Sequence, residues 1–367
     1  MRRSSGIQDQ RERADAILRG GPPGGPRFRA GATVSLEGMG DEERRAAPPV
    51  VCHGHSRPVM RVGLSKHTPD GVFLVSACKD GAPMLRDSAG IWLGTFEGHN
   101  GAVWDACLNG PATHAFTASA DFTAKAFDAF TGSCVATFTH PHVVKSASVS
   151  PDSSLLAAGG FAKTLFVHDL EHAAHEPPGE IGRIPFHSSI RCARFVHSNH
   201  LVAVALSGTK CLSLIDARTM AEVSRAQLPF EPSTVELSFN GSSFVCAGEH
   251  GACIFDADKP SSPIKELQFH QSVTAAAVFQ ERDAVATGGQ DMWVHMCDYQ
   301  TGKSHCALGF YALTLLFAGC LFRSCFPLCA AATKRGHHGP VHTLSLSEDD
   351  SLLASGSEDG TIRLWSV

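Results

Sequence analysis

Residues 355–365 near the end of the chain read Ser-Gly-Ser-Glu-Asp-Gly-Thr-Ile-Arg-Leu-Trp, and this stretch decides the fold. Its centre, Glu358-Asp359-Gly360, is typical of a tight turn, because Asp initiates turns and Gly adopts positive φ at no steric cost. The apolar and β-branched residues on either side favour strands. The segment from Gly336-His337 onward therefore predicts a small antiparallel sheet.

Strand-like segments that end in an acidic residue and a turn recur along the rest of the chain. Their last residues are Asp87, Asp128, Asp169, Asp216, Asp256, Asp298 and, in the final copy, Ser366. The successive steps are 41, 41, 47, 40, 42 and 68 residues. Most of them lie in or near the spacing of about 40–45 residues that four-stranded WD-type propeller blades show. The repeat predicts an all-β, seven-bladed WD40 β-propeller over residues 48–367.

The final copy holds only three of its four strands. We expect Pro49–Cys52 to supply the outer strand of that sheet, so that the two ends of the propeller share one blade. Such sharing closes the ring and leaves no open sheet edge.

Two segments fall outside the repeat. Residues 1–47 contain nine Arg and a Gly/Pro run at 20–26, and we expect a disordered tail because so little apolar surface can be buried there. The oversized step contains an apolar insertion at about residues 307–333. Its uncharged run of 16 residues is short for a membrane-spanning helix, which needs about 20. The other interpretations are an exposed apolar loop and a segment absent from the mature protein, and we expect no membrane association.

Four copies carry a His followed by an Asp at a repeated distance. A catalytic interpretation would make these groups acid–base pairs, but an active site does not recur once per blade. We therefore expect buried hydrogen bonds that fasten loops. The pairs are His55/Asp80, His99/Asp121, His270/Asp291 and His337/Asp359.

The sequence offers little that is typical of an enzyme or a metalloprotein. The spacing of the Cys and His residues matches no zinc pattern, and phosphate-binding loops and nucleophile motifs are missing. We expect no catalytic activity, cofactor, metal ion or small-molecule substrate. The net charge of −5 also argues against nucleic-acid binding through bulk charge.

Three stretches resemble one family of WD40 proteins. They are Pro83-Met84-Leu85-Arg86, residues 94–104 (Gly-Thr-Phe-Glu-Gly-His-Asn-Gly-Ala-Val-Trp) and residues 120–129 (Ala-Asp-Phe-Thr-Ala-Lys-Ala-Phe-Asp-Ala). They closely resemble the serine-threonine kinase receptor-associated protein family, also called unr-interacting protein. The final copy from residue 336 matches the same family.

The resemblance implies a non-enzymatic adaptor in the cytoplasm and nucleus. Its implied partners are members of the survival-of-motor-neuron (SMN/Gemin-type) complex, which assembles spliceosomal small nuclear ribonucleoproteins, and mRNA-binding regulators. RNA contact would be indirect. The alternatives are a component like the i subunit of translation initiation factor 3, and a signalling adaptor of transforming-growth-factor-β-type kinase receptors.

Partner binding is expected at the end of the propeller where loops enter the innermost strands. Residues shortly after each blade His, and the residue before each Asp, should surround the central entrance. Apolar and aromatic groups beside a cation are typical of binding hot spots. The candidates are Arg57, Met60, Lys79, Trp104, Lys145 and Glu358.

Overall fold

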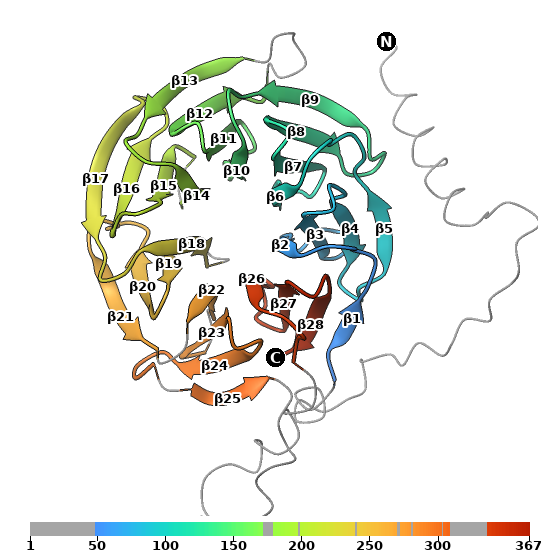
Figure 1. The fold of residues 1–367 in the computed structure, drawn as a ribbon, viewed down its shortest axis with the longest axis vertical. Helices are drawn as coiled ribbons and strands as arrows, with labels where there is room; N and C mark the ends of the chain where they lie inside the picture. The colour runs from blue at the N-terminus through green and yellow to red at the C-terminus, as the bar shows by residue number, and fades with distance from the viewer. Residues whose placement is uncertain are drawn as a thin grey trace, which may run out of the picture. The chain divides into compact units, whose positions relative to one another are not determined.

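The computed structural model describes residues 48–171, 179–196, 199–238, 241–269, 272–279, 282–302, 304–308 and 336–367. All helices and strands assigned within these ranges are β-strands, and they form seven four-stranded antiparallel sheets. The sheets are arranged as a ring (Figure 1). The prediction of an all-β, seven-bladed propeller is confirmed. The predicted tail and residues 309–335 of the insertion region lie outside the described ranges, which contain no helix able to cross a membrane.

Six blades are built from four strands that follow one another in the chain, from the centre of the ring outward, and the seventh takes its outermost strand from the start of the propeller (Figure 1). The innermost strands are β2 (Val59–Leu64), β6 (Val103–Leu108), β10 (Val144–Val149), β14 (Ile190–Phe195), β18 (Pro232–Leu237), β22 (Val273–Val278) and β26 (Val341–Leu346). The second strands are β3 (Phe73–Cys78), β7 (His114–Ser119), β11 (Leu155–Gly160), β15 (Leu201–Leu206), β19 (Ser243–Gly248), β23 (Ala284–Gly289) and β27 (Leu352–Ser357).

The two outer positions of each blade complete the sheets. The third strands are β4 (Met84–Asp87), β8 (Thr123–Asp128), β12 (Thr164–Asp169), β16 (Cys211–Asp216), β20 (Gly251–Asp256), β24 (Val294–Asp298) and β28 (Ile362–Ser366). The outermost strands are β5 (Trp92–Thr95), β9 (Cys134–Thr139), β13 (Glu180–Pro185), β17 (Ala221–Gln227), β21 (Pro263–Gln268), β25 (Ser304–Leu308) and β1 (Val50–Cys52).

Blade 7 joins the two ends of the ring as expected. Strand β1 pairs antiparallel with β28, with Val50 opposite Leu364 and Cys52 opposite Ile362. Cys52 and Leu364 are buried in a core cluster that also contains residues of β2 and β3. The closing strand therefore contributes to the packing between blades 7 and 1 as well as to one sheet.

Three of the predicted His–Asp pairs form and fasten the loops of blades 1, 2 and 7. The histidine Nδ1 and the aspartate Oδ2 lie 2.7–3.2 Å apart in His55–Asp80, His99–Asp121 and His337–Asp359. Burial lowers the pKa of each imidazole more than its aspartate raises it, so the rings are neutral at physiological pH. These are structural hydrogen bonds that recur from blade to blade.

Blade 7 shows the complete network. Nε2 of His337 lies 2.7 Å from the Ser355 hydroxyl, which also accepts a 2.8 Å hydrogen bond from the Trp365 indole. The other blades place different residues at the Trp365 position. In blade 1 that residue is Arg86, the last residue of the Pro-Met-Leu-Arg signature, and it donates hydrogen bonds to the carbonyl oxygens of His53 and Gly90.

In the fourth predicted pair, Asp291 contacts a histidine other than the predicted His270. His270 lies outside the described residues, and Asp291 Oδ2 lies 2.5 Å from Nε2 of His295 on β24. Because His295 follows Asp291 by four residues, this contact joins the turn to the strand that leaves it.

Blade 3, which lacks the Asp, has a cluster of rings in place of the network. The rings of His140 and His168 lie 5.4 Å apart, with Phe138 4.7 Å from His168 and Phe166 4.8 Å from His140. Burial lowers the pKa of His140 to about 3, with a further contribution from His168, and lowers the pKa of His168 to about 4. Both imidazoles are therefore neutral and packed as aromatic core residues.

Candidate functional site

The same β-bulge occurs in every innermost strand. In β2 the pairing with β3 shifts between Val59 and Arg61, which leaves Met60 unpaired, and the other six strands repeat this shift at their second residue. A bulge redirects the side chain of the extra residue. The seven bulge residues are Met60, Trp104, Lys145, Arg191, Ser233, Thr274 and His342, and all of them line one pocket of about 490 Å³.

This pocket, the funnel, opens at the end of the ring where loops enter the innermost strands. Antiparallel connections bring the loops between second and third strands to the same end. Phe161 and Ser207, which follow β11 and β15, complete the lining together with deeper residues of the innermost strands. Repetition of one bulge in seven blades thus produces a single concave site.

The funnel gathers most of the residues proposed from the sequence. Met60, Trp104 and Lys145 line it directly, and Nζ of Lys79 lies 5.7 Å from the centroid of the Trp104 ring. Glu358 contacts the funnel through His342 of blade 7, whose Nε2 is 2.5 Å from its Oε2.

The sixth candidate lies apart from these residues. The side chain of Arg57 is exposed in the loop before β2 and is absent from the described funnel lining. Its carbonyl oxygen accepts a hydrogen bond from Sγ of Cys78 (3.0 Å), so its backbone takes part in fastening blade 1.

Lys145 is the centre of a positive region within the funnel. Its Nζ lies 4.6 Å from the Trp104 ring centroid and 5.3 Å from that of Phe161, distances typical of cation–π contacts. Burial lowers the pKa of Lys145, and the positive charges of Arg191 and Lys79 lower it further. Arg191 has a carboxylate partner, since its Nη2 is 2.6 Å from Oε1 of Glu231.

Two ion pairs cross the ring below the bulge residues. Arg194 of β14 binds both carboxylate oxygens of Asp105 of β6, at 2.7 and 3.0 Å. Arg61 of β2 binds both oxygens of Glu236 of β18, with Nη2 2.6 Å from Oε2. Burial opposes the charge on Arg194, but Asp105 outweighs it and raises the pKa of this guanidinium above its ordinary value. We call these four residues the ion-pair layer.

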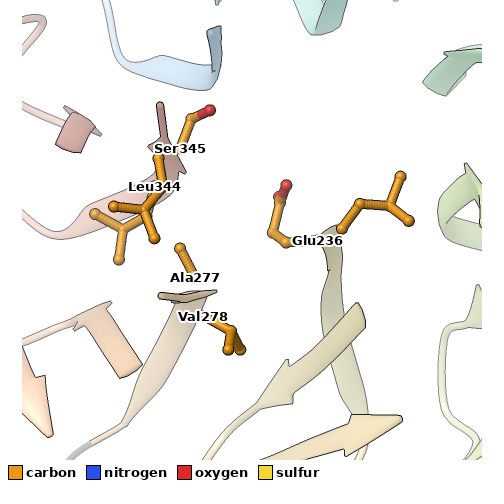
Figure 2. Close-up of a pocket in the computed structure, with 7 residues that line it drawn as sticks. Glu236, Ala277, Val278, Leu344 and Ser345 are labelled. Carbon is orange, nitrogen blue, oxygen red and sulfur yellow. The ribbon is translucent and has the colours of Figure 1, made fainter. Parts of the chain in front are cut away.

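The ion-pair layer separates the funnel from a second pocket at the opposite end of the ring. That pocket, of about 370 Å³, is lined by the loops that leave the innermost strands, and Arg61 and Arg194 line both pockets. Figure 2 shows Glu236, Ala277 and Ser345, from three neighbouring innermost strands, around a smaller cavity of about 30 Å³ on the same side. The described channel is therefore interrupted by charged side chains.

Possible metal donors come together at one place in the described ranges, in blade 1. Donor atoms of His55, Cys78 and Asp80 lie within 4.8 Å of one another. Sγ of Cys78 donates to the Arg57 carbonyl, and burial raises the pKa of this thiol to about 12. The three groups are thus accounted for as the hydrogen-bonded network of their blade.

Sequence reasoning missed Arg191, Ser233 and Thr274 at the mouth of the funnel. They occupy the same bulge position as Met60, Trp104 and Lys145, but that position was counted as the fifth residue after a blade histidine. Arg191 and Ser233 lie in blades to which no such histidine was assigned, and Thr274 is the fourth residue after His270. The available signal was their place as the second residue of each innermost strand, the same place that Met60, Trp104 and Lys145 hold in theirs.

These features define a class of protein, the WD40-repeat propellers, here with a funnel at one end of the ring. The family described as WD domain, G-beta repeat matches residues 90–128, 132–169 and 330–366. The serine-threonine kinase receptor-associated protein of Gallus gallus is 37% identical over 319 residues, which cover 86% of this chain and 82% of the relative. The serine-threonine kinase receptor-associated protein of Dictyostelium discoideum is 35% identical over 319 residues, which cover 98% of that protein.

The chain belongs to the serine-threonine kinase receptor-associated protein family. A more distant similarity connects it to the eukaryotic translation initiation factor 3 subunit I of Caenorhabditis elegans, which is 26% identical over 330 residues, 95% of that protein. The family expected from the Pro-Met-Leu-Arg signature is thus the one shown.

Proposed function

We propose that this protein is a non-enzymatic scaffold that holds protein partners at the funnel. The observation that carries the proposal is the funnel itself, where an aromatic and an apolar bulge residue, Trp104 and Met60, lie beside Lys79 and Lys145. Concave surfaces with such side chains at their centre are typical of binding hot spots. The His–Asp pairs are explained by the blades and leave no acid–base role to assign in the described sheets.

The cellular process we propose is ribonucleoprotein assembly and mRNA metabolism, with SMN/Gemin-type proteins and mRNA-binding regulators as partners and RNA bound through them. This proposal is supported by the family resemblance, and the location that we propose with it is the cytoplasm and nucleus. A second candidate, participation in translation initiation, is supported by the similarity to the factor 3 subunit I proteins. A third candidate, receptor signalling, is suggested by the name of the family.

Affinity purification of the tagged full chain from its own cells, with and without RNase, tests these candidates. We expect Sm and SMN-type proteins to be recovered in both conditions. Recovery of initiation-factor subunits and ribosomes would replace the first candidate with the second, and recovery of receptor kinases would replace it with the third.

A funnel variant locates the binding site in the same experiment. We expect Trp104→Ala combined with Lys79→Glu to abolish partner recovery while Tm changes by only a few degrees. Trp92→Ala is the matched control. Trp92 is 56% exposed on β5, the outermost strand of its sheet, so it lies far from the ring axis. Unchanged recovery with the funnel variant would place the partners elsewhere.

A further inference from the structure

A row of aromatic rings leads from the funnel onto the loops of blades 2 and 3. The ring of Phe122 lies 5.5 Å from His142, which lies 5.7 Å from Phe161. Phe161 is joined to Trp104 through Lys145, which contacts both rings. Phe122 and Phe161 are 45% and 44% exposed. We call these four rings, Phe122, His142, Phe161 and Trp104, the aromatic arc.

The backbone of Phe122 indicates that its ring is held outward at an energetic cost. Phe122 has a φ of 70°, a left-handed conformation that is strained for a bulky residue. Blades 1 and 7 place Gly81 and Gly360 at the same position after the Asp, with φ values of 86° and 76°. The turn therefore favours glycine. Phenylalanine at this position destabilises the turn relative to glycine but contributes an exposed ring to the arc.

Within the described part of the chain, the cations beside the arc lack negative partners. Among the described residues, no carboxylate forms an ion pair with Lys79 or Lys145, whereas the neighbouring Arg191 is paired with Glu231. Other acids on these loops, Asp80 and Asp121, are held by hydrogen bonds to their own blade histidines. A carboxylate that binds between Lys79 and Lys145 could form ion pairs with both lysines without displacing an existing partner.

We propose that the aromatic arc, together with Lys79 and Lys145, binds an extended protein segment in which a carboxylate side chain neighbours a large apolar one. The carboxylate pairs with the two lysines at the funnel mouth, and the apolar side chain packs on the exposed rings of Phe122 and Phe161. The inference rests on the proposed scaffold function and specifies the chemistry of the partner.

The same surface is poorly suited to single-stranded RNA. Such sites stack bases on open aromatic faces and neutralise several phosphates along a basic groove. Here two ammonium groups already lie over the Trp104 ring, and the chain carries a net charge of −5. The observations therefore favour an acidic peptide.

Selection of short random peptides displayed on phage against the purified full chain tests the proposal. We expect enrichment of peptides that contain Asp or Glu next to Phe, Leu, Met or Trp. Enrichment of peptides without acidic residues, or no enrichment over the uncoated surface, would overturn it. Tighter binding of an oligouridine than of the best selected peptide, measured by fluorescence anisotropy, would also overturn it and assign the surface to RNA.

Variants then connect the selected peptide to the arc. We expect Lys145→Glu to weaken its binding by about tenfold or more, because the charge facing the carboxylate is reversed. Phe122→Gly should weaken binding severalfold without lowering Tm by more than about 2 °C, since it relieves a strained turn. A loss of binding accompanied by a large fall in Tm would instead indicate a structural role and contradict the assignment.

Blade 6 provides the matched control for the turn variant. Met292 occupies the same position after its Asp, with a φ of 68° and 43% exposure, in a blade that contributes no ring to the arc. We expect Met292→Gly to leave peptide binding unchanged. Because the peptide selection uses no cell extract, it can fail while ribonucleoprotein partners are still recovered, or succeed when they are not. Failure of the two proposals is thus distinguishable.

Discussion

Replacing Asp105 by Asn should destabilise the ring more than any comparable change at its surface. The Asp105 carboxylate is 3% exposed and accepts hydrogen bonds from Arg194, from the Ser146 hydroxyl at 3.0 Å and from the Ala147 amide at 2.9 Å. Asn keeps the shape but removes the charge, and its amide N–H groups face donors. Arg194 would then be a buried cation without an anion, which costs about 3–5 kcal/mol.

The expected loss corresponds to a fall in Tm of roughly 6–10 °C, at about 2 °C per kcal/mol for a domain of this size. Differential scanning calorimetry of the full chain at neutral pH measures it. Asp152→Asn is the matched control, because Asp152 makes several hydrogen bonds in an exposed turn and should change stability by less than about 1 kcal/mol. Equal Tm values for the two variants would refute the reasoning, since the ion-pair layer would then be screened by water.

A double variant separates the loss of a pair from the loss of one partner. When both members of a buried ion pair become apolar, the cost is small or absent, because no unpaired charge is left. We therefore expect Asp105→Leu with Arg194→Leu to be more stable than either single variant. A double variant less stable than both single ones would mean that the two residues act independently.

Three further predictions concern the closure and the fastening of the blades. Deleting residues 48–53 should cost about 3 kcal/mol or more in urea unfolding, because Cys52 and its partners lose their burial; a deletion variant as stable as the full chain would contradict the closure. Ser355→Ala should cost about 2 kcal/mol or more in the same assay, since the Trp365 indole loses its acceptor. The depressed pKa values of His140 and His168 mean that unfolding takes up protons below pH 6.5, so stability present above that pH is lost as pH falls toward 3. Between pH 7 and 5 each ring should contribute a loss of up to about 2 kcal/mol, and His140→Phe should flatten the measured dependence.

Much of this fold is predictable because its information is local. Six of the seven blades are runs of four consecutive strands, and a turn such as Glu358-Asp359-Gly360 specifies its own geometry. Repetition at nearly constant spacing then gives the number of blades, and the three-stranded final copy required a partner that Val50–Cys52 supplies.

The ion-pair layer could not be read in the same way. Arg61 and Glu236 are 175 residues apart, and Asp105 and Arg194 are 89 residues apart. Each alone is an ordinary charged residue in a short strand. Only the closed ring brings third and fifth residues of different innermost strands to one axis, so their pairing depends on geometry that no local pattern contains. Counting from the blade histidine found Met60, Trp104 and Lys145, while the candidate Arg57 has its side chain outside the funnel lining.

The seven-fold bulge allows the funnel surface to change without loss of the fold. The third and fifth residues of the innermost strands are constrained, because Asp105 and Arg194 must match each other across the ring. The bulge residues have no opposing residue in the strand ladder, so a substitution such as Lys145→Glu alters the funnel surface and leaves the sheet pairing intact. Under the proposed function, binding specificity and ring stability reside in adjacent residues of the same strand. A single substitution can change one property with little effect on the other, and the contrast between Asp105 and Lys145 variants measures that separation directly.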